Sequence, residues 1–453
     1  MDKNAFIKMV FEKAKAAGFS DCELIISSGE EFEVNIFKGE ILQYTSASSD
    51  GIGFRGLYNG RMGSSSTMVY DEEAADQLVT NALEAAVLIE NEDVQFIYGG
   101  DEKYPELESY YPALADVPAA DKIALAKELE KTALSLDERA DRTEGSEVIY
   151  SMGSSRIVNT KGLDVSSQVN MAAAFIAPVL TEDGKSSTDF VIESATDFEE
   201  LKAKKDEMAQ RGVKTAADFL HAKSIPSGEY KVLFDNDTFS TILATFSGVF
   251  SAENAQKGLS LLKGREGEDI AAQCLTITDD PLRQGSMASR PFDAEGVACF
   301  AKNVVENGKF VTLLHNLKTA YKQGVKTTAN AGRAGLSGSV RVAPTNFYVQ
   351  PGTKTREELA ADVGEGLLIT QLQGMHAGAN GVTGDFSLAA KGYVIKDGKI
   401  ADPAEQFTVA GNFYQLLKDV VEVGCDLKFG MPGGSCFGSP TVRVKGLSIA
   451  GQG

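Results

Sequence analysis

The spacing of hydrophobic positions near the start of the chain changes twice, and each spacing predicts a different element. The first helix, which ends near Gly18, is predicted from apolar residues three and four positions apart: Ile7, Val10, Phe11 and Ala14. From Cys22 to about Tyr70 polar and apolar residues alternate, with Phe32, Val34 and Ile36 on one side, and this alternation predicts strands. We expect tight turns where glycines interrupt it, at Gly39, Gly51, Gly53, Gly56 and Gly60.

Further helices and long strands follow in the same half. One helix is predicted after Asp71, with apolar positions at Leu78, Val79, Ala82, Ala86 and Ile89. Another follows Pro118, with Ile123, Ala126, Leu129, Ala133 and Leu136 facing inward. Long strands are expected between about 143 and 192, joined by a hairpin turn at 159–162. The capping box Thr196-Asp197-Phe198-Glu199 predicts a helix that runs to about Ala222.

The segment 224–228, which contains Pro226 and Gly228, marks the expected domain boundary because a long helix stops there and a strand begins at Tyr230. Short strand-like runs separated by turns follow, and helices are predicted after the capping box Thr355–Glu358 and after Asn412. The prediction is an α+β protein. Residues 1–223 form an N-terminal domain of strands packed on helices, and residues 224–453 form a mostly antiparallel, barrel-like β domain.

Composition narrows the classes of function. The formal net charge of −20 disfavours direct nucleic-acid binding, which needs a basic surface. The five cysteines are scattered without CxxC spacing, so the sequence predicts neither a disulfide framework nor a thiolate zinc cluster. The N-terminus leads directly into an amphipathic helix, and no 18-residue apolar stretch occurs. We therefore expect a cytoplasmic protein that does not enter a membrane.

Only three histidines are available for acid–base or metal chemistry: His221, His315 and His376. No two lie within five positions, so a helix with two zinc-binding histidines one turn apart cannot form. His221 is interpreted as a helix C-terminal cation and His315 as a buried histidine among strands. His376 differs because it lies in the glycine-rich loop 374–387, which also contains Asn380, Thr383 and Asp385.

Cys436 lies in Gly434-Ser435-Cys436-Phe437-Gly438, which has the spacing of a nucleophile elbow with cysteine in place of serine. An elbow needs a helix after it, whereas the alternating run 441–444 predicts a strand. A buried apolar role, an auxiliary metal ligand and a nucleophile therefore all stay open for this thiol.

Several segments, taken together in order, resemble the TldD/PmbA (TldD/TldE) family of metallopeptidases and modulators of DNA gyrase. They are Asp293–Gly296, Asn307–Lys309, Thr328–Ala331, Pro344–Gly352, Val382–Ser387, Gly392–Lys399, Ala410–Asn412 and Val423–Leu427. In that family the TldD-type subunit carries a His-Glu-x-x-x-His helix and a later cysteine that bind the catalytic metal. The corresponding helix here, around 241–250, has no histidine. The resemblance therefore implies the PmbA/TldE type, with no catalytic residue, metal or cofactor in this chain and with zinc in a TldD-like partner.

This resemblance implies a subunit of a metallopeptidase complex in proteolysis or peptide maturation, which forms a substrate chamber and holds an extended peptide. The implied partner is a TldD-like subunit in a heterodimer, or a second copy in a homodimer. Two alternatives stay open: a stand-alone hydrolase that uses Cys436 with His376, and a non-enzymatic protein-binding regulator of DNA gyrase. Candidate interface or substrate-cavity residues are His376, Asn380, Thr383, Asp385 and Cys436.

Overall fold

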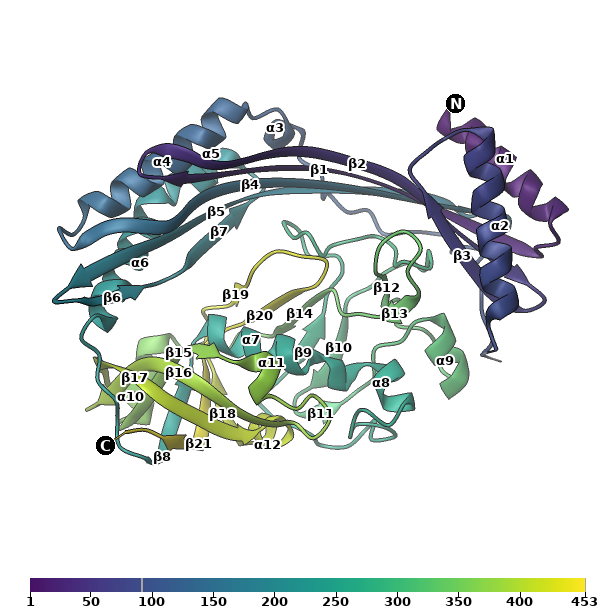
Figure 1. Ribbon diagram of the computed structural model, residues 1–453. Coiled ribbons are helices and arrows are strands. Elements are labelled where there is room, and N and C mark those ends of the chain that lie inside the picture. Colours follow the sequence, from purple (N-terminus) through teal and green to yellow (C-terminus); the bar gives the residue numbers. More distant parts are fainter. Residues whose placement is uncertain (91–92, 453) are drawn as a thin grey trace.

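A computed structural model describes residues 1–90 and 93–452. A long, curved antiparallel sheet from the first half of the chain arches over a body built by the second half (Figure 1). The body contains a closed five-stranded barrel. The predicted α+β class and the barrel-like second half are confirmed. Among the described residues, no helix combines the length and the hydrophobicity needed to cross a membrane.

The arched sheet has seven strands in the order β3-β2-β1-β4-β5-β6, and β7 also pairs with β5. Its strands are β1 (Asp21–Phe37), β2 (Glu40–Tyr58), β3 (Arg61–Thr67), β4 (Ala140–Asn159), β5 (Asp164–Glu182), β6 (Lys185–Thr188) and β7 (Val191–Ala195). The turn between β4 and β5 lies where the sequence places it, and Asn159 Oδ1 accepts the backbone N–H groups of Lys161 and Leu163.

Helices cover both ends of one face of this sheet (Figure 1). They are α1 (Lys3–Ala16), α2 (Glu72–Leu88), α3 (Pro112–Ala115), α4 (Ala119–Ser135), α5 (Phe198–Ala203) and α6 (Lys205–Phe219). Leu24 and Ile26 of β1 pack with α1 and α2, whereas Phe32 and Val34 of the same strand pack with α4. All four have even numbers, so they share one face of the strand. The other face is therefore turned toward the C-terminal body.

Three local predictions need correction. Leu136 is 43% exposed because α4 ends one residue before it. Asp197, not Thr196, caps the next helix, since its side chain accepts the N–H of Glu199. That helix is also broken at Lys204 into α5 and α6. The helix predicted after Asp71 is present as α2, and the Asp71 side chain caps it by accepting the N–H of Ala74.

The glycines of the first strands are the clearest difference from expectation. Gly39 and Gly60 do form turns with positive φ, but Gly51, Gly53 and Gly56 lie inside β2. A Cβ at Gly53 would stand 2.0 Å from the backbone oxygen of Leu336. Gly51 and Gly53 therefore let a loop of the C-terminal body approach the sheet. Gly56 serves packing within the N-terminal half, because a Cβ there would stand 2.6 Å from the Phe19 ring.

The barrel consists of β8 (Gly228–Phe234), β15 (Gly366–Gln373), β16 (Asp385–Lys396), β17 (Lys399–Asn412) and β21 (Val442–Ala450), with β18 (Val420–Val423) beside β21. It closes where β17 pairs with β21. A second sheet holds β9 (Ile277–Asp279), β10 (Lys302–Glu306), β11 (Lys309–Phe310), β14 (Asn346–Val349), β19 (Lys428–Phe429) and β20 (Cys436–Ser439). The strands β12 (Ala331–Arg333) and β13 (Val340–Val342) form a separate hairpin.

The helices of the body are α7 (Asn236–Phe246), a 3-10 turn (Ser247–Phe250), α8 (Ala252–Gln256), α9 (Leu317–Gln323), α10 (Arg356–Val363), α11 (Met375–Gly378) and α12 (Phe413–Asp419). The predicted capping box at Thr355 and Glu358 is present. Phe413, at the start of α12, stacks on Phe246 of α7 with ring centroids 4.7 Å apart. This contact joins the barrel to α7, which lies beside the second sheet.

Candidate functional site

Three of the predicted site residues belong to one turn between β15 and β16. Asn380 Oδ1 accepts the backbone N–H groups of Val382 and Thr383, and the N–H of Asn380 donates to the carbonyl of Asp385. Asn412 Nδ2 lies 2.8 Å from Asp385 Oδ1. This bond, followed by one from Thr383, lowers the pKa of Asp385. The turn therefore holds an exposed carboxylate in its ionised form.

His376 lies on α11, just before this turn, and its side chain is exposed. Residues 377–381 and 385–387 line a shallow hollow, and His376 is not among them. Within the described part of the chain, the His376 ring has neither a hydrogen bond nor an ion pair. The structure therefore places His376 close in sequence to the turn but gives it no carboxylate or thiol partner.

Cys436 lies elsewhere, on β20, and is buried. Its thiol donates to the carbonyl of Gly433, with Sγ 3.6 Å from the oxygen. The next long element is β21, a strand, as the sequence predicts, so the helix of a nucleophile elbow is absent after this cysteine. The five predicted residues are thus divided between the 374–387 loop and β20.

Cys436 lines a cavity of about 240 Å³ between the arched sheet and the C-terminal body. We call this cavity the interdomain pocket. The sheet contributes Met171, Ile192, Glu193 and Ser194, and the body contributes Arg283, Gly285, Ser286, Leu427, Lys428, Phe429, Gly430, Pro432 and Cys436. No histidine is among these described residues, so the thiol has no imidazole base in its own pocket.

Charged groups in the interdomain pocket are linked across the two domains. Glu193 of β7 lies 2.9 Å from Arg211 of α6, and 3.9 Å from Lys428 of β19. Lys428 Nζ lies closer to Asp237 of α7, at 3.0 Å. The first turn of α7 is therefore connected to the rim of the pocket.

The donor groups of α7 do not fit a zinc ion. This helix reads Asn-Asp-Thr-Phe-Ser-Thr-Ile-Leu-Ala-Thr-Phe, and its carboxylate Asp237 is paired with Lys428. Its hydroxyls are used internally, since Ser240 and Thr241 both donate to the carbonyl of Asp237. Zinc requires thiolate, imidazole and carboxylate ligands. Among the described residues, no three such side chains are grouped so that they could hold a metal ion.

The N-cap of α7 is the buried carboxylate of Asp235, which accepts the N–H of Thr238. Burial, together with the nearby Asp237, raises the pKa of Asp235 to about 7. This carboxyl group therefore titrates near neutrality, but it points to the backbone of its own helix.

A buried ionic cluster, which sequence reasoning missed, joins the arched sheet to the body. Glu23 of β1 accepts hydrogen bonds from Arg55 of β2, at 2.7 Å, and from Arg333 of β12, at 3.1 Å. Glu295 lies 4.0 Å from Arg55, and its carboxylate accepts the N–H of Leu317. Burial and the neighbouring Asp293 raise the pKa of Glu295 to about 7. The signal in the sequence was a charged residue on the inner side of a strand, such as Glu23 or Arg55. Their partners Glu295 and Arg333 are too remote in the sequence to be found from it.

A second buried cluster of polar side chains joins two of the segments on which the family resemblance rests. Asp279 Oδ1 accepts the N–H and the hydroxyl of Thr345. Its other oxygen accepts from Asn330, at 2.8 Å, and from Lys302, at 3.1 Å. The Thr328–Ala331 and Pro344–Gly352 segments are therefore held together around one carboxylate, and their polar residues are structural.

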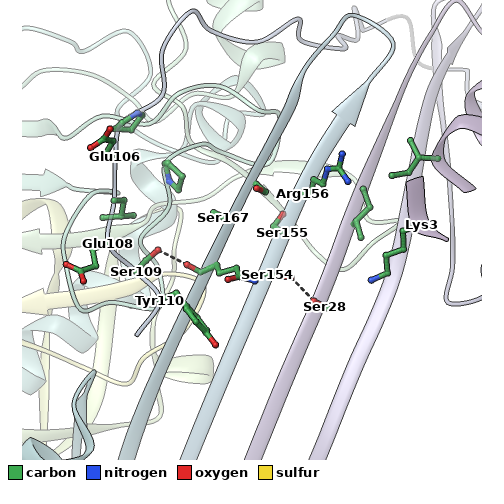
Figure 2. A pocket seen from close by; sticks show the side chains of 17 residues that line it. Lys3, Ser28, Glu106, Glu108, Ser109, Tyr110, Ser154, Ser155, Arg156 and Ser167 are labelled. Atoms are coloured by element: carbon green, nitrogen blue, oxygen red, sulfur yellow. Dashed lines mark hydrogen bonds between the residues drawn. The ribbon is translucent and has the colours of Figure 1, made fainter. Parts of the chain in front are cut away.

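Another cavity, of about 710 Å³, lies on the helix-covered side of the sheet between α1 and the segment 105–110. Figure 2 shows hydroxyl groups along its floor, where Ser28 and Ser154 hydrogen-bond across neighbouring strands at 2.6 Å. Ser109 ties the segment to the sheet by donating to the carbonyl of Gln168. No histidine lines this cavity among the described residues, so its serines lack an imidazole base.

Comparisons with known proteins give this architecture a family. Three domain models of the PmbA/TldA metallopeptidases match: domain 1 over residues 22–86, the central domain over 112–220 and the C-terminal domain over 227–451. The chain belongs to the PmbA/TldD family. This result confirms the resemblance found in the sequence.

Relatives of known structure share the whole fold. A candidate modulator of a DNA gyrase from Thermotoga maritima is 33% identical, with a TM-score of 0.90, and the match covers 99% of this chain and 100% of that one. TldE from Thermococcus kodakarensis matches with a TM-score of 0.88 at 22% identity, over 98% of this chain and all of that one, which is a likeness of fold alone. The chain is also 28% identical to the metalloprotease PmbA homolog of Haemophilus influenzae, covering 93% of this chain and 91% of that protein.

Proposed function

We propose that this chain is the PmbA/TldE-type subunit of a cytoplasmic metallopeptidase complex that acts in proteolysis or peptide maturation. In this proposal a TldD-like partner supplies the catalytic zinc, and this chain completes the chamber that holds the peptide substrate. The family name supports the proteolytic setting, since the relatives are called metalloproteases.

The observation that carries the proposal is the chemistry of α7. The helix that would bear metal ligands presents hydroxyl, amide and apolar groups, and its one acidic side chain is neutralised by Lys428. Such a surface cannot hold zinc, but the adjoining interdomain pocket can still contact a substrate. A role in binding is therefore better supported than a role in bond cleavage.

The stand-alone hydrolase hypothesis has less support. Cys436 has no histidine beside it in the interdomain pocket, and His376 belongs to an exposed loop. Without an imidazole beside it, the thiol lacks the general base that this hypothesis assigns to His376. The 374–387 loop suits a contact with a partner subunit instead, because its turn keeps polar groups exposed at a fixed position.

The test is to purify the chain alone and together with a TldD-like protein encoded beside it, and to measure zinc by elemental analysis and peptidase activity in parallel. We expect stoichiometric zinc and cleavage only in the co-purified sample. Zinc or cleavage in the lone chain would contradict the proposal. Failure of the two proteins to associate would contradict the partnership.

A further inference from the structure

Among the described residues, Arg283 of the interdomain pocket has no ion-pair partner. Its guanidinium lies over the ring of Phe429, with Cζ 4.0 Å from the ring centroid. Within the described residues, no carboxylate oxygen lies within 4.0 Å of this guanidinium and no hydrogen bond is made to it. A guanidinium that stacks on a ring keeps its N–H edge free for a planar anion.

The aromatic support of Arg283 is itself fixed. The ring of Phe429 packs against Tyr348 of β14, with centroids 5.4 Å apart. Phe429 lies on β19, which pairs with β20, and β14 pairs with β20 from the other side. The guanidinium therefore rests on a rigid surface, and little side-chain entropy would be lost when it binds a ligand.

The other two charged residues of the pocket, Glu193 and Lys428, each have a partner of opposite charge. Glu193 is matched by Arg211 at 2.9 Å, and Lys428 is matched by Asp237 at 3.0 Å. Of the described lining residues, Arg283 is the one charged side chain that has no such partner. The chain as a whole has a net charge of −20, so a local positive charge does not reflect its general surface charge. It indicates a specific anionic ligand.

The rest of the lining limits the kind of anion. Met171, Ile192 and Pro432 give the pocket apolar walls, and its volume of about 240 Å³ suits a group the size of one amino-acid residue. Glu193 would repel a doubly charged phosphate more strongly than a singly charged carboxylate. A carboxylate attached to an apolar side chain fits both features.

We propose that the interdomain pocket binds the C-terminal residue of a peptide, with the terminal carboxylate on Arg283 and the side chain against Met171, Ile192 and Pro432. This inference rests on the proposed function, which makes a peptide the substrate, and it names the end of the peptide that this subunit holds. It assigns Arg283 as a substrate-positioning residue.

The test is fluorescence anisotropy with the purified full chain and three dye-labelled hexapeptides. The first ends in leucine with a free carboxylate, the second is its C-terminal amide, and the third is an amide with an internal glutamate. We expect the free acid to bind about 10-fold or more tightly than either amide, since a charge-assisted pair is lost in both. Equal binding of the free acid and its amide would overturn the proposal, and so would equal binding of the internal glutamate peptide.

Substitutions of Arg283 distinguish a role of its guanidinium in binding from a role in folding. Arg283→Met should reduce binding of the free acid to the level of the amide, whereas Arg283→Lys should keep part of it, because lysine retains the charge but not the planar fork. Arg142→Met, at an exposed arginine paired with Asp141, is the matched control and should bind like the wild type. If Arg283→Met does not fold, binding by Arg283→Lys is the test. Unchanged binding of the free acid by that variant would overturn the planar, two-point contact between the guanidinium and the carboxylate.

This experiment needs neither a partner nor a metal. The carboxylate preference can therefore fail while the co-purified complex still cleaves peptides. Equally, the preference can hold in a chain that never associates with a TldD-like subunit. The two proposals are thus contradicted by different results.

Discussion

Arg333 and Glu23 are 310 residues apart in the sequence, yet Arg333 Nη2 lies 3.1 Å from Glu23 Oε1 in the buried contact between the two halves of the molecule. The same oxygen accepts Arg55 Nε at 2.7 Å. Burial and the nearby Arg55 lower the pKa of Arg333 to about 10. A single carboxylate thus separates two buried guanidinium groups and fixes the arched sheet on the body.

Removing that carboxylate charge should be strongly destabilising. Glu23→Gln leaves Arg55 and Arg333 buried beside each other with only the more distant Glu295, 4.0 Å from Arg55, as a counter-charge. We expect the free energy of unfolding to fall by about 3–5 kcal/mol. Urea denaturation followed by circular dichroism measures this change. Asp164→Asn breaks the exposed pair with Arg156 and is the matched control, with an expected loss below about 1 kcal/mol. Equal losses in the two variants would show that the buried cluster stabilises the fold no more than an exposed ion pair does.

The raised pKa of Glu295 predicts a pH dependence of stability. Between the ordinary glutamate value and about 7, the folded protein keeps a proton on Glu295 that the unfolded chain has lost. The free energy of unfolding therefore falls as pH rises through this window, and it levels off above it. Asp235, whose pKa is also raised to about 7, acts in the same direction.

The variant Glu295→Gln isolates this contribution, because an amide oxygen can still accept the N–H of Leu317. Urea denaturation at several pH values between about 5 and 8 should give a shallower decline for the variant than for the wild type, by about 1–3 kcal/mol across the range. Parallel curves for the two proteins would mean that Glu295 does not titrate in this window.

Gly53 should not tolerate a side chain. A Cβ there would stand 2.0 Å from the backbone oxygen of Leu336, so Gly53→Ala must displace the loop between β12 and β13. We expect a loss of about 2 kcal/mol or more in thermal or urea unfolding. Gly153→Ala is the matched control on β4, where the nearest atom would be 3.7 Å away. Comparable losses in both variants would attribute the effect to strand glycines in general.

Cys436 should be dispensable for peptide cleavage by the complex. Its thiol has no histidine in the interdomain pocket, so we expect Cys436→Ala to change kcat/KM of the co-purified complex by less than about twofold. Cys425→Ala, at an exposed cysteine, is the control. A fall of about a hundredfold or more in the Cys436 variant alone would instead support a nucleophilic role.

Local patterns predicted much of the fold, because short-range physics decides those elements. The helix after Asp71 and the turn at 159–162 were predicted correctly, since a cap and an asparagine act within a few residues. The glycines of β2 were misassigned to turns, because the reason for Gly53 is Leu336, which no pattern near residue 53 reveals.

The candidate site was predicted only in part for the same physical reason. Asn380, Thr383 and Asp385 belong to one turn, so their grouping follows from sequence proximity. Arg283 and Phe429 meet within the folded body, and Glu193 joins them only after the sheet has docked. Each looks like an ordinary surface or strand residue in the sequence. Sites between domains are built by tertiary contacts and are therefore the hardest to find in this way.

The closed barrel has a consequence for the order in which the chain acquires its structure. Strand β8 begins at Gly228, but one of its neighbours is β21, whose pairing partners run from Val442 to Ile449. During synthesis the arched sheet can form as soon as β7 has left the ribosome. The barrel cannot close until β21 emerges, because β21 pairs with both β8 and β17. Because contacts over such distances cost loop-closure entropy and form slowly, β8 must wait with an unpaired edge. The interval before β21 arrives is thus the stage at which a nascent chain is most exposed to aggregation and most in need of a chaperone.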